Sequence, residues 1–278
     1  MISIVIPTLN ESNYLADTLQ SIFDAVSNPI EIIVVDGGSV DNTVEIAMKF
    51  GVQVVLCGNG RSYQMNAGAT VATGDILVFL HGDTRVPTGF DRWVGGWVDP
   101  LKSPTPSGQA TPKLRETMRM RRTMGVEVGM NEKYNFKSRL FHKNHVSPLV
   151  REDFPIAGAF NLKINSDRSG LRWVEWGVKV RSKFFNLPYG DQALFLKAST
   201  FHELGGFPEL PIMEDFVFVR SLSKRGKITI VPASVTTSAR RWEQQGIFKT
   251  TIINQIMILG YYLGISPDRL KQWYRSTR

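Results

Sequence analysis

The sequence predicts an α/β protein with a mostly parallel central sheet and helices on both faces. Over the first hundred residues, short β-branched apolar runs alternate with stretches of helical periodicity, which is typical of parallel strands joined by crossover helices. A chain of 278 residues that is 42% hydrophobic can bury such a core. Three acidic residues, Glu11, Asp36 and Asp83, follow successive apolar strands.

Each expected strand of this first half is followed by a helix or by an acidic loop. Asn10 and Ser12 are expected to cap the first helix, and Asp41 and Asn42 the second. In chain order, the expected elements are a strand over 2–6 that ends at Pro7, a helix over 14–23, a strand over 30–35, a helix over 41–49, a strand over 52–56, a helix over 63–72 and a strand over 76–80.

The composition changes near Asp99, where a stretch rich in proline and glycine precedes a basic segment. Residues 101–151 hold eleven Lys and Arg against three Glu, a difference of eight that equals the net charge of the whole chain. This segment contains no recognisable nucleic-acid-binding module, so we expect no nucleic-acid partner. It is either a solvated flexible insertion or a surface for an anionic membrane.

A second ordered region is expected from residue 154 onwards. It includes an aromatic-rich helix around Trp173 and Trp176, and a Met213–Asp215 turn before a further helix. Its other expected elements are an apolar run over 157–160, a loop over 188–192, a strand over 193–197, a helix over 199–204 that ends at Gly205 and Gly206, and a helix that runs through Arg225.

In open parallel sheets, ligands bind beyond the carboxyl ends of the strands, where the three acidic residues are expected. Each of them could also be a simple helix cap, but three at one sheet edge favour a binding site. The first turn, Pro7–Glu11, contains no glycine, which excludes a dinucleotide-binding domain with its G-x-G-x-x-G loop.

Seven short blocks, in this order, resemble the inverting family 2 glycosyltransferases of GT-A fold. They cover roughly residues 1–95 and 155–243, and are Ile4–Glu11, Val34–Thr43, Asn66–Asp75, Phe79–Asp83, Gly205–Phe207, Glu214–Asp215 and Arg241–Trp242. The chain is most similar to a bacterial subgroup with Arg-x-x-Gln-Met-Asn-Ala-Gly and His-x-Asp-Thr motifs, here Arg61–Gly68 and His81–Thr84.

The resemblance implies a nucleotide-sugar site in the first half. Asp36 would accept hydrogen bonds from the base or ribose of a UDP-sugar or another NDP-sugar, and Arg61 would face the base. The resemblance adds Pro7, Thr8 and Glu11 to the lining of this pocket.

Asp83 matches the last acid of the family's metal-binding motif, which holds a divalent cation, Mn²⁺ or Mg²⁺, on the diphosphate. The first acid of that motif is His81 here. Imidazole is a poor ligand for Mg²⁺ and an acceptable one for Mn²⁺. His81 is therefore a metal ligand, a contact to phosphate or sugar, or a packing residue.

The resemblance places the acceptor chemistry in the second half. Asp215 matches the catalytic base that removes the acceptor hydroxyl's proton, and Glu214 would orient the acceptor or Asp215. Asp215 could also cap the helix that follows. Asp191 and Gln192 either contact the donor sugar or serve as turn residues.

Arg241 and Trp242 resemble the Arg-Trp pair that lies near the acceptor and diphosphate in processive family members. Arg240 and Arg241 are expected at the diphosphate, and Trp242 beside it, because guanidinium groups match phosphate geometry. The expected glutamine three places before the arginine is Ser238, so processive polymerisation is not predicted.

The C-terminal stretch 247–273 is apolar and has two interpretations, a helix packed on the catalytic unit or a surface helix that lies on a membrane. The second interpretation would suit a lipid acceptor. With a single cysteine, Cys57, and no recognisable signal peptide, we expect a cytoplasmic protein, or one peripheral on the inner face of the membrane.

Together, these patterns predict a hexosyltransferase-type enzyme, class EC 2.4, that transfers a sugar from an NDP-sugar to a hydroxyl of unknown identity. The alternatives are a catalytically silent module that binds a nucleotide-sugar or lipid, and a sugar nucleotidyltransferase. The expected divisions are a nucleotide-sugar half over 1–98, a basic insertion over 99–152, an acceptor half over 153–243 and a helical segment over 244–278.

Overall fold

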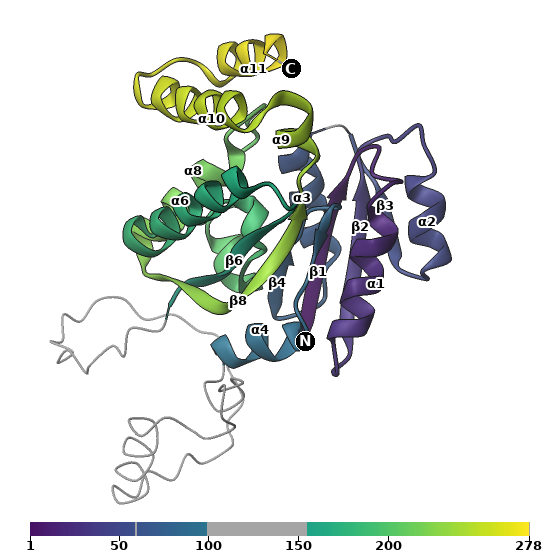
Figure 1. The fold of residues 1–278 in the computed structure, drawn as a ribbon. Helices are drawn as coiled ribbons and strands as arrows, with labels where there is room; N and C mark the ends of the chain where they lie inside the picture. The colour runs from purple at the N-terminus through teal and green to yellow at the C-terminus, as the bar shows by residue number, and fades with distance from the viewer. Residues whose placement is uncertain (59, 99–154, 278) are drawn as a thin grey trace, which may run out of the picture.

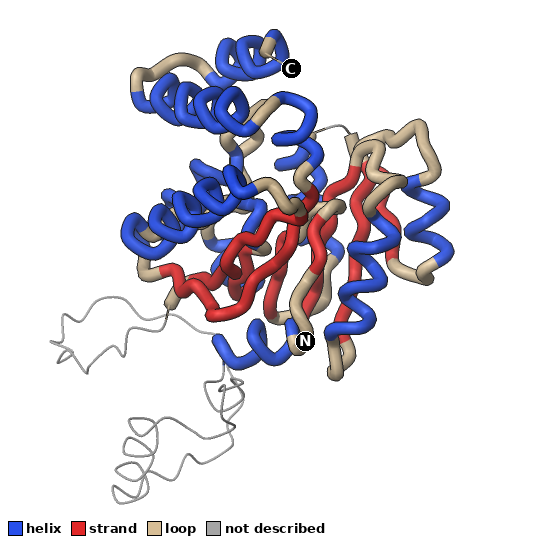
Figure 2. Tube along the Cα trace, in the orientation of Figure 1, coloured by secondary structure: helices blue, strands red, loops and turns tan. Residues whose placement is uncertain are grey.

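The computed structural model describes residues 1–58, 60–98 and 155–277, which share one eight-stranded sheet in the order β3-β2-β1-β4-β7-β6-β8-β5. Helices cover both faces of the sheet (Figure 1), and the strands form a layer between them (Figure 2). This confirms the predicted α/β class. The basic segment 101–151 lies outside the described residues.

The elements alternate along the first half and continue after the undescribed segment. The first half contains β1 (Ile2–Thr8), α1 (Leu15–Ala25), β2 (Ile30–Asp36), α2 (Thr43–Lys49), β3 (Gln53–Leu56), α3 (Arg61–Val71), β4 (Ile76–Phe79), β5 (Thr84–Arg85) and α4 (Phe90–Val98). The second contains β6 (Ala157–Asn165), α6 (Ser169–Phe185), β7 (Leu194–Lys197), α7 (Ala198–Glu203), α8 (Glu214–Arg225), β8 (Ile228–Ser238), α9 (Arg240–Gln245), α10 (Ile247–Tyr262) and α11 (Pro267–Ser276).

The sheet is mostly parallel, with strand β7 as the junction between the two halves. Strands β3, β2, β1 and β4 are parallel neighbours, and β6 is parallel to β8. Strand β7 runs antiparallel to both β4 and β6, and Leu194 at its start pairs with Phe79 at the end of β4. The loop before β7 therefore meets the loop after β4 at one edge of the sheet.

Strand β1 continues through Pro7 to Thr8, two residues beyond the prediction. The backbone nitrogens of Val5 and Pro7 face β4, because alternate residues of a strand bond to the same neighbour. The last hydrogen bond between β1 and the β4 side runs from Leu80 N–H to the Val5 carbonyl. Because the pairing with β4 ends there, the missing N–H of Pro7 leaves no gap in the ladder.

The expected caps of the first helix are wrong. Helix α1 has Tyr14 at its N-cap position and no side-chain cap. Asn10 instead accepts a hydrogen bond at Oδ1 from Val40 N–H at 2.9 Å, and Ser12 N–H donates to Asp41. These side chains hold the two loops after β1 and β2 together.

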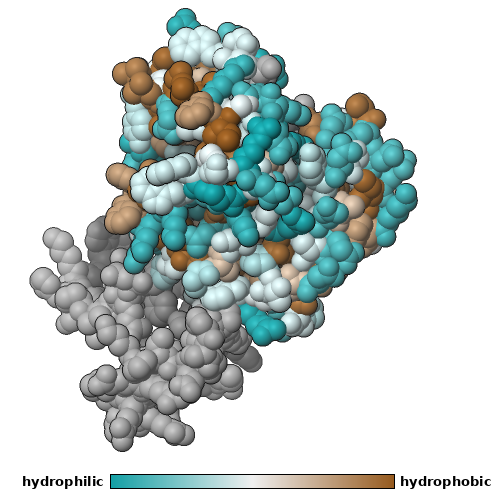
Figure 3. Space-filling model, viewed as in Figure 1, coloured by the Kyte–Doolittle hydropathy of each residue, from teal (hydrophilic) through white to brown (hydrophobic). Residues whose placement is uncertain are grey.

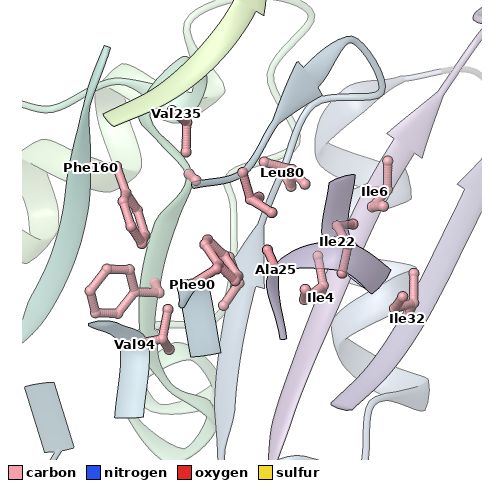
Figure 4. Packing of buried hydrophobic residues seen from close by; sticks show 14 of the residues in the cluster. Ile4, Ile6, Ile22, Ala25, Ile32, Leu80, Phe90, Val94, Phe160 and Val235 are labelled. Carbon is pink, nitrogen blue, oxygen red and sulfur yellow. The ribbon is translucent and has the colours of Figure 1, made fainter. Parts of the chain in front are cut away.

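Two apolar clusters fill the spaces on the two faces of the sheet. Alternation along β1 sends Ile4 and Ile6 to one face and Val5 to the other. On the first face, Phe90 of α4 stacks on Phe160 of β6 with ring centroids 5.0 Å apart. Figure 4 shows both side chains in one cluster with Val94. The two halves of the chain therefore share one continuous core.

A third, smaller apolar cluster joins α10 to α11 through Ile253, Met257 and Leu270. Within the described ranges, no helix has both the length and the apolar character that crossing a membrane requires.

Candidate active site

Seven chain segments bring charged side chains to the edge of the sheet where β1, β2 and β4 end. Four come from the first half and three from the second. They are the loop after β1 with Glu11, the end of β2 with Asp36, the start of α3 with Arg61, the loop after β4 with His81 and Asp83, the turn before β7 with Asp191, the start of α8 with Glu214 and Asp215, and the start of α9 with Arg240.

Arg61 joins the two halves of the chain at this edge. Its Nε donates to Glu214 Oε1 at 2.6 Å, and its Nη2 lies 3.6 Å from Asp215 Oδ2. The Glu214 side chain is only 5% exposed, so the guanidinium supplies the countercharge that this buried carboxylate needs. The sequence predicted Arg61 at the nucleotide base, and in the structure its guanidinium pairs with Glu214 and Asp215.

Asp215 is held in an ionised form by its surroundings. Burial raises the pKa of its carboxyl. The charge of Arg61 and the backbone N–H groups of Gly190 and Phe216 outweigh this effect and bring the pKa below the ordinary value of 3.8. Gly190 N–H donates to Oδ2 at 3.1 Å, and Phe216 N–H to Oδ1 at 2.7 Å. Asp215 is therefore a carboxylate near neutral pH, which is the form that a general base requires.

His81 lies beside Arg61, with 3.3 Å between Nε2 and the Arg61 Nη1. Burial lowers the pKa of the imidazole, and the charge of Arg61 lowers it further. The neutral ring thus offers its Nε2 lone pair to the guanidinium. A cation at that nitrogen would be repelled by Arg61, so the structure does not favour His81 Nε2 as the predicted metal ligand.

Asp83 and Glu11 share a second arginine, Arg240. Arg240 binds both oxygens of Glu11, with the Nη1–Oε2 distance at 2.7 Å, and its Nε lies 3.4 Å from Asp83 Oδ2. Ser238 Oγ donates to the same Asp83 oxygen at 2.6 Å, whereas the one contact of Oδ1 with a described residue is a long one of 3.5 Å to the Thr237 hydroxyl. One oxygen of Asp83 therefore remains open to another partner.

Asp36 is 1% exposed, and its carboxylate accepts hydrogen bonds from its own loop and from Thr8 at the end of β1. Oδ1 accepts from the N–H groups of Gly38 and Ser39, and Oδ2 from the hydroxyls of Ser39 and Thr8. These four bonds use the lone pairs of a carboxylate. Asp36 thus shapes the loop after β2, and a nucleoside could reach it only by displacing one of these donors.

Asp191 carries an unsatisfied oxygen in the site. Its Oδ1 is buried without a hydrogen-bond partner among the described residues. Burial raises the pKa of this carboxyl, and the charge of Arg181 offsets the rise only in part. Such an oxygen is available to a hydrogen-bond donor or cation that is absent from the protein itself.

Of the two roles predicted for Gln192, donor-sugar contact or turn residue, the structure favours the second. Gln192 is 0% exposed, its Nε2 donates to Phe160 O at 2.8 Å, and its Oε1 accepts from Ser182 Oγ at 2.8 Å. The amide therefore supports the turn before β7 from inside the core.

Arg241 and Trp242 also point away from Asp83. The Arg241 guanidinium donates to Asn254 of α10 at 2.9 Å and lies over the ring of Tyr274 in α11. Trp242 packs against the core. Of the three residues predicted at the diphosphate, only Arg240 lies with the acidic cluster.

Sequence reasoning missed two supports of the site. Gln64, buried in α3, donates to Thr8 O at 2.7 Å and to Val35 O at 2.8 Å, which fixes the ends of β1 and β2. Gly190 lies so close to Asp215 and His81 that an added Cβ would be 3.2 Å from Asp215 Oδ2 and 3.3 Å from His81 Nε2. The Arg-x-x-Gln spacing was a usable signal for Gln64; the requirement at Gly190 depends on contacts that sequence does not reveal.

The acidic edge fits a divalent cation that brings most of its own ligands. In the part of the chain that the structure describes, no group of three or more His, Cys, Asp and Glu residues is arranged to hold a metal. Among the described residues, Asp83 Oδ1 has one long hydrogen bond and the buried Asp191 Oδ1 has none, so these oxygens have lone pairs that a cation could use. Mg²⁺ and Mn²⁺ commonly bind through one or two carboxylates and complete their shell with water and phosphate.

A surface hollow of about 590 Å³ adjoins this edge, and its lining residues are Asn165, Ser166, Asp167, Arg168 and Glu243. Asn165 is the register partner of Ser238, which binds Asp83, so the hollow opens near the acidic cluster.

The first part of the chain is similar in sequence to known glycosyltransferases. The sequence profile described as "Glycosyl transferase family 2" matches residues 3–146. The "PGL/p-HBAD biosynthesis glycosyltransferase" of Mycobacterium bovis (strain BCG / Pasteur 1173P2) is 39% identical over 90 residues, which are 30% of this chain. The chain spans only 35% of the length of that relative.

Known structures share the fold. TarS 1-349 of S. aureus, solved with UDP, superposes with a TM-score of 0.51 at 16% identity over 86% of this chain and 61% of its own. Mannosyltransferase PcManGT of Pyrobaculum calidifontis, solved with GDP-Man and Mn²⁺, gives 0.51 at 18% identity over 84% and 56%. At these identities the likeness concerns the fold alone, and it confirms the predicted GT-A architecture.

The substitution Arg61→Gln is expected to destabilise the protein in a pH-dependent way. The folded-state pKa of Asp215 is lowered, so its ionised form contributes stability above the unfolded-state pKa near 3.8, and this contribution is lost as the pH falls through the folded-state pKa. Losing a buried partner costs about 3–5 kcal/mol, but Arg61 is 40% exposed, so we expect about 1–2 kcal/mol near neutral pH.

Urea unfolding across the range from about pH 7 down to about pH 3 measures this loss, which should shrink as the carboxylates become protonated. The exposed Arg92→Gln is the matched control and should stay within about 0.5 kcal/mol of the native protein throughout. An equal loss for Arg61→Gln at every pH would contradict the electrostatic role of Arg61.

Proposed function

The chain belongs to glycosyl transferase family 2, and we propose that it transfers a sugar from a nucleoside-diphosphate sugar to an acceptor hydroxyl with inversion at the anomeric carbon. The activity would fall in class EC 2.4, and we propose a hexose as the transferred unit. The observation that carries the proposal is the acidic edge, where the ionised Asp215 and the open oxygen of Asp83 are gathered from two halves of the chain.

Asp215 is the proposed catalytic base. Its carboxylate would take the proton of the acceptor hydroxyl while that oxygen attacks the anomeric carbon, and the bond from that carbon to the diphosphate oxygen would break on the opposite face. Arg61 supports this role because it keeps Asp215 ionised until the proton arrives. Glu214 anchors Arg61 at 2.6 Å and so positions the base indirectly.

The proposed donor side is the edge formed by Pro7, Thr8, Glu11 and Asp36. Asp36 would accept a hydrogen bond from the nucleoside after the Ser39 hydroxyl gives way, since its lone pairs are already used. The buried, unpartnered Asp191 Oδ1 would accept a hydrogen bond from a hydroxyl of the donor sugar, which would satisfy that oxygen. Among the similar solved structures, TarS holds UDP and PcManGT holds GDP-Man, which favours a nucleoside-diphosphate donor here.

Asp83 is the proposed protein ligand of a divalent cation. When bound, Mn²⁺ or Mg²⁺ would neutralise charge on the departing diphosphate. Arg240 is the second proposed phosphate contact, and it would have to leave Glu11 or Asp83 in part to reach the diphosphate. The PcManGT complex contains Mn²⁺ together with its donor, which agrees with this proposal.

These assignments give the two halves of the chain different proposed roles. Residues 1–98 would bind the nucleotide-sugar and residues 153–243 would serve the acceptor, with the polar hollow beside Asn165 as a candidate place for it. A silent binding module would use the donor side alone, and a nucleotidyltransferase would need no base for an acceptor hydroxyl. Asp215 therefore separates the three hypotheses.

We expect Asp215→Asn to lower kcat by about 10²–10⁴, because the amide cannot accept the acceptor's proton. The release of nucleoside diphosphate from a panel of UDP- and GDP-sugars measures turnover, and calorimetry with the free diphosphate measures donor-side binding, which should not change. The exposed Asp24→Asn, near the C-terminal end of α1 and outside the proposed donor and acceptor sites, serves as the control. Turnover equal to that of the native protein would exclude Asp215 as the base.

Nucleoside diphosphate together with Mn²⁺ should raise the thermal unfolding midpoint, because ligands that bind only the folded state stabilise it. Asp83→Ala should reduce this shift, while the exposed Asp24→Ala should leave it intact. Differential scanning calorimetry with UDP or GDP, with and without Mn²⁺, gives the measurement. If none of these combinations shifts the midpoint, the nucleotide-sugar proposal fails.

A further inference from the structure

Helix α10 is apolar on two different sides, and only one of them is covered by the rest of the described chain. Its inner side, with Ile253 and Met257, packs against α11. Its outer side carries a stripe of exposed side chains, Phe248, Ile252, Ile256, Leu259 and, just beyond the helix, Leu263. Phe248 is 85% exposed and Leu263 is 71% exposed.

The spacing of these five residues places them on one side of the helix. Steps of four, four, three and four residues keep successive side chains within one narrow sector of a helix with 3.6 residues per turn. A surface helix normally presents polar residues on this side. A stripe of this length is therefore expected to contact an apolar surface outside the described chain.

Helix α6 exposes a second apolar group next to α10. Trp173, Trp176 and Phe184 are all more than half exposed. The two helices touch near their N-terminal ends, where a Cβ on Gly170 would lie 2.9 Å from Ile247 Cδ1. Figure 3 shows brown, hydrophobic side chains gathered over the region of α10 near the top of the view.

The charge around this surface is strongly positive. Helices α6, α10 and α11 carry eight Lys and Arg residues against two acidic ones, Glu175 and Asp268. Lys179, Lys183 and Lys249 are exposed and form no ion pair with any residue that the structure describes. Lysines bordering an apolar stripe suit a negatively charged apolar partner.

We propose that the α10 stripe (Phe248, Ile252, Ile256, Leu259 and Leu263), together with the exposed aromatics of α6, docks on an anionic lipid bilayer. Aliphatic side chains would enter the acyl boundary, tryptophans would lie at the headgroup level, and the lysines would bind anionic headgroups. A second copy of the chain is a poorer occupant, because it would bring the same positive charge and lysine is depleted at protein interfaces.

The docking surface has a consequence for the proposed transfer reaction, and this consequence alone depends on that reaction. Helix α9, which begins with Arg240 at the acidic edge, leads directly into α10. A bilayer on the α10 stripe would therefore lie close to the site and could present acceptors that are carried on lipids.

Vesicle flotation of the full chain tests the docking surface. We expect binding to phosphatidylcholine vesicles that contain phosphatidylserine, weak binding to phosphatidylcholine alone, and release at high salt because exposed charges are screened. The triple variant Phe248→Ser/Ile256→Ser/Leu259→Ser should lose at least about tenfold in bound fraction, because it removes apolar area from the lipid contact.

The matched control is Val40→Ser/Met48→Ser/Leu56→Ser, which removes three exposed apolar side chains elsewhere and should bind like the native protein. Urea unfolding of each variant checks that the fold is retained. Both variants keep residues 101–151, so a difference between them reports on α10. Equal flotation of both variants, or no flotation of the native protein, would overturn the proposal.

Light scattering tests whether a second copy of the chain, rather than a bilayer, covers the α10 stripe. If the native chain is a dimer that the α10 variant converts to a monomer, without vesicle binding by either, the stripe is a protein interface and the bilayer proposal is wrong. Diphosphate release from sugar donors is measured without vesicles, so failure of docking and failure of the proposed transferase activity are distinguishable.

Discussion

Two adjacent carboxylates that are largely removed from water need a cation, and Arg61 supplies it for Glu214 and Asp215. This contact links residues 153 positions apart and holds the start of α8 against the start of α3. It also sets the protonation state of Asp215, since the guanidinium charge and two backbone N–H groups outweigh the effect of burial on its pKa. The geometry of the acidic edge and its chemistry thus depend on one guanidinium.

Arg240 repeats this arrangement on the donor side. It binds Glu11 with both terminal nitrogens and lies 3.4 Å from Asp83, so here the second half of the chain supplies the cation for acids of the first half, the reverse of the Arg61 contact. Strand β7 makes both contacts feasible because its antiparallel pairing with β4 and β6 brings the two halves to one edge. In the proposed reaction, the diphosphate and its cation would replace part of this internal charge balance, which couples donor binding to the position of α9.

The sequence was sufficient for the class of fold and for the edge that gathers the acids, because strand ends and helix starts follow from local patterns. It was not sufficient for the partners of those side chains. Asn10 offers the same oxygen to a helix or to a neighbouring loop, and only the packing of β1 on β2 gives it to Val40. Gln192 looked like a loop residue, but the turn before β7 rotates it into the core. Arg241 is next to Arg240 in sequence, yet the helical turn of α9 directs it toward α10. The roles of the site residues in binding and transfer remain predictions.

The central claim is that Arg61 keeps Asp215 ionised as a base at this edge. Its most direct test is an NMR titration of the Asp215 side-chain carboxyl carbon, assigned through Asp215→Asn, in the native protein and in Arg61→Gln. We predict that Asp215 titrates below its ordinary pKa of 3.8 in the native protein, and that its pKa rises when Arg61 is replaced. A native Asp215 that titrates at or above that value, or one that is insensitive to Arg61, would contradict this claim.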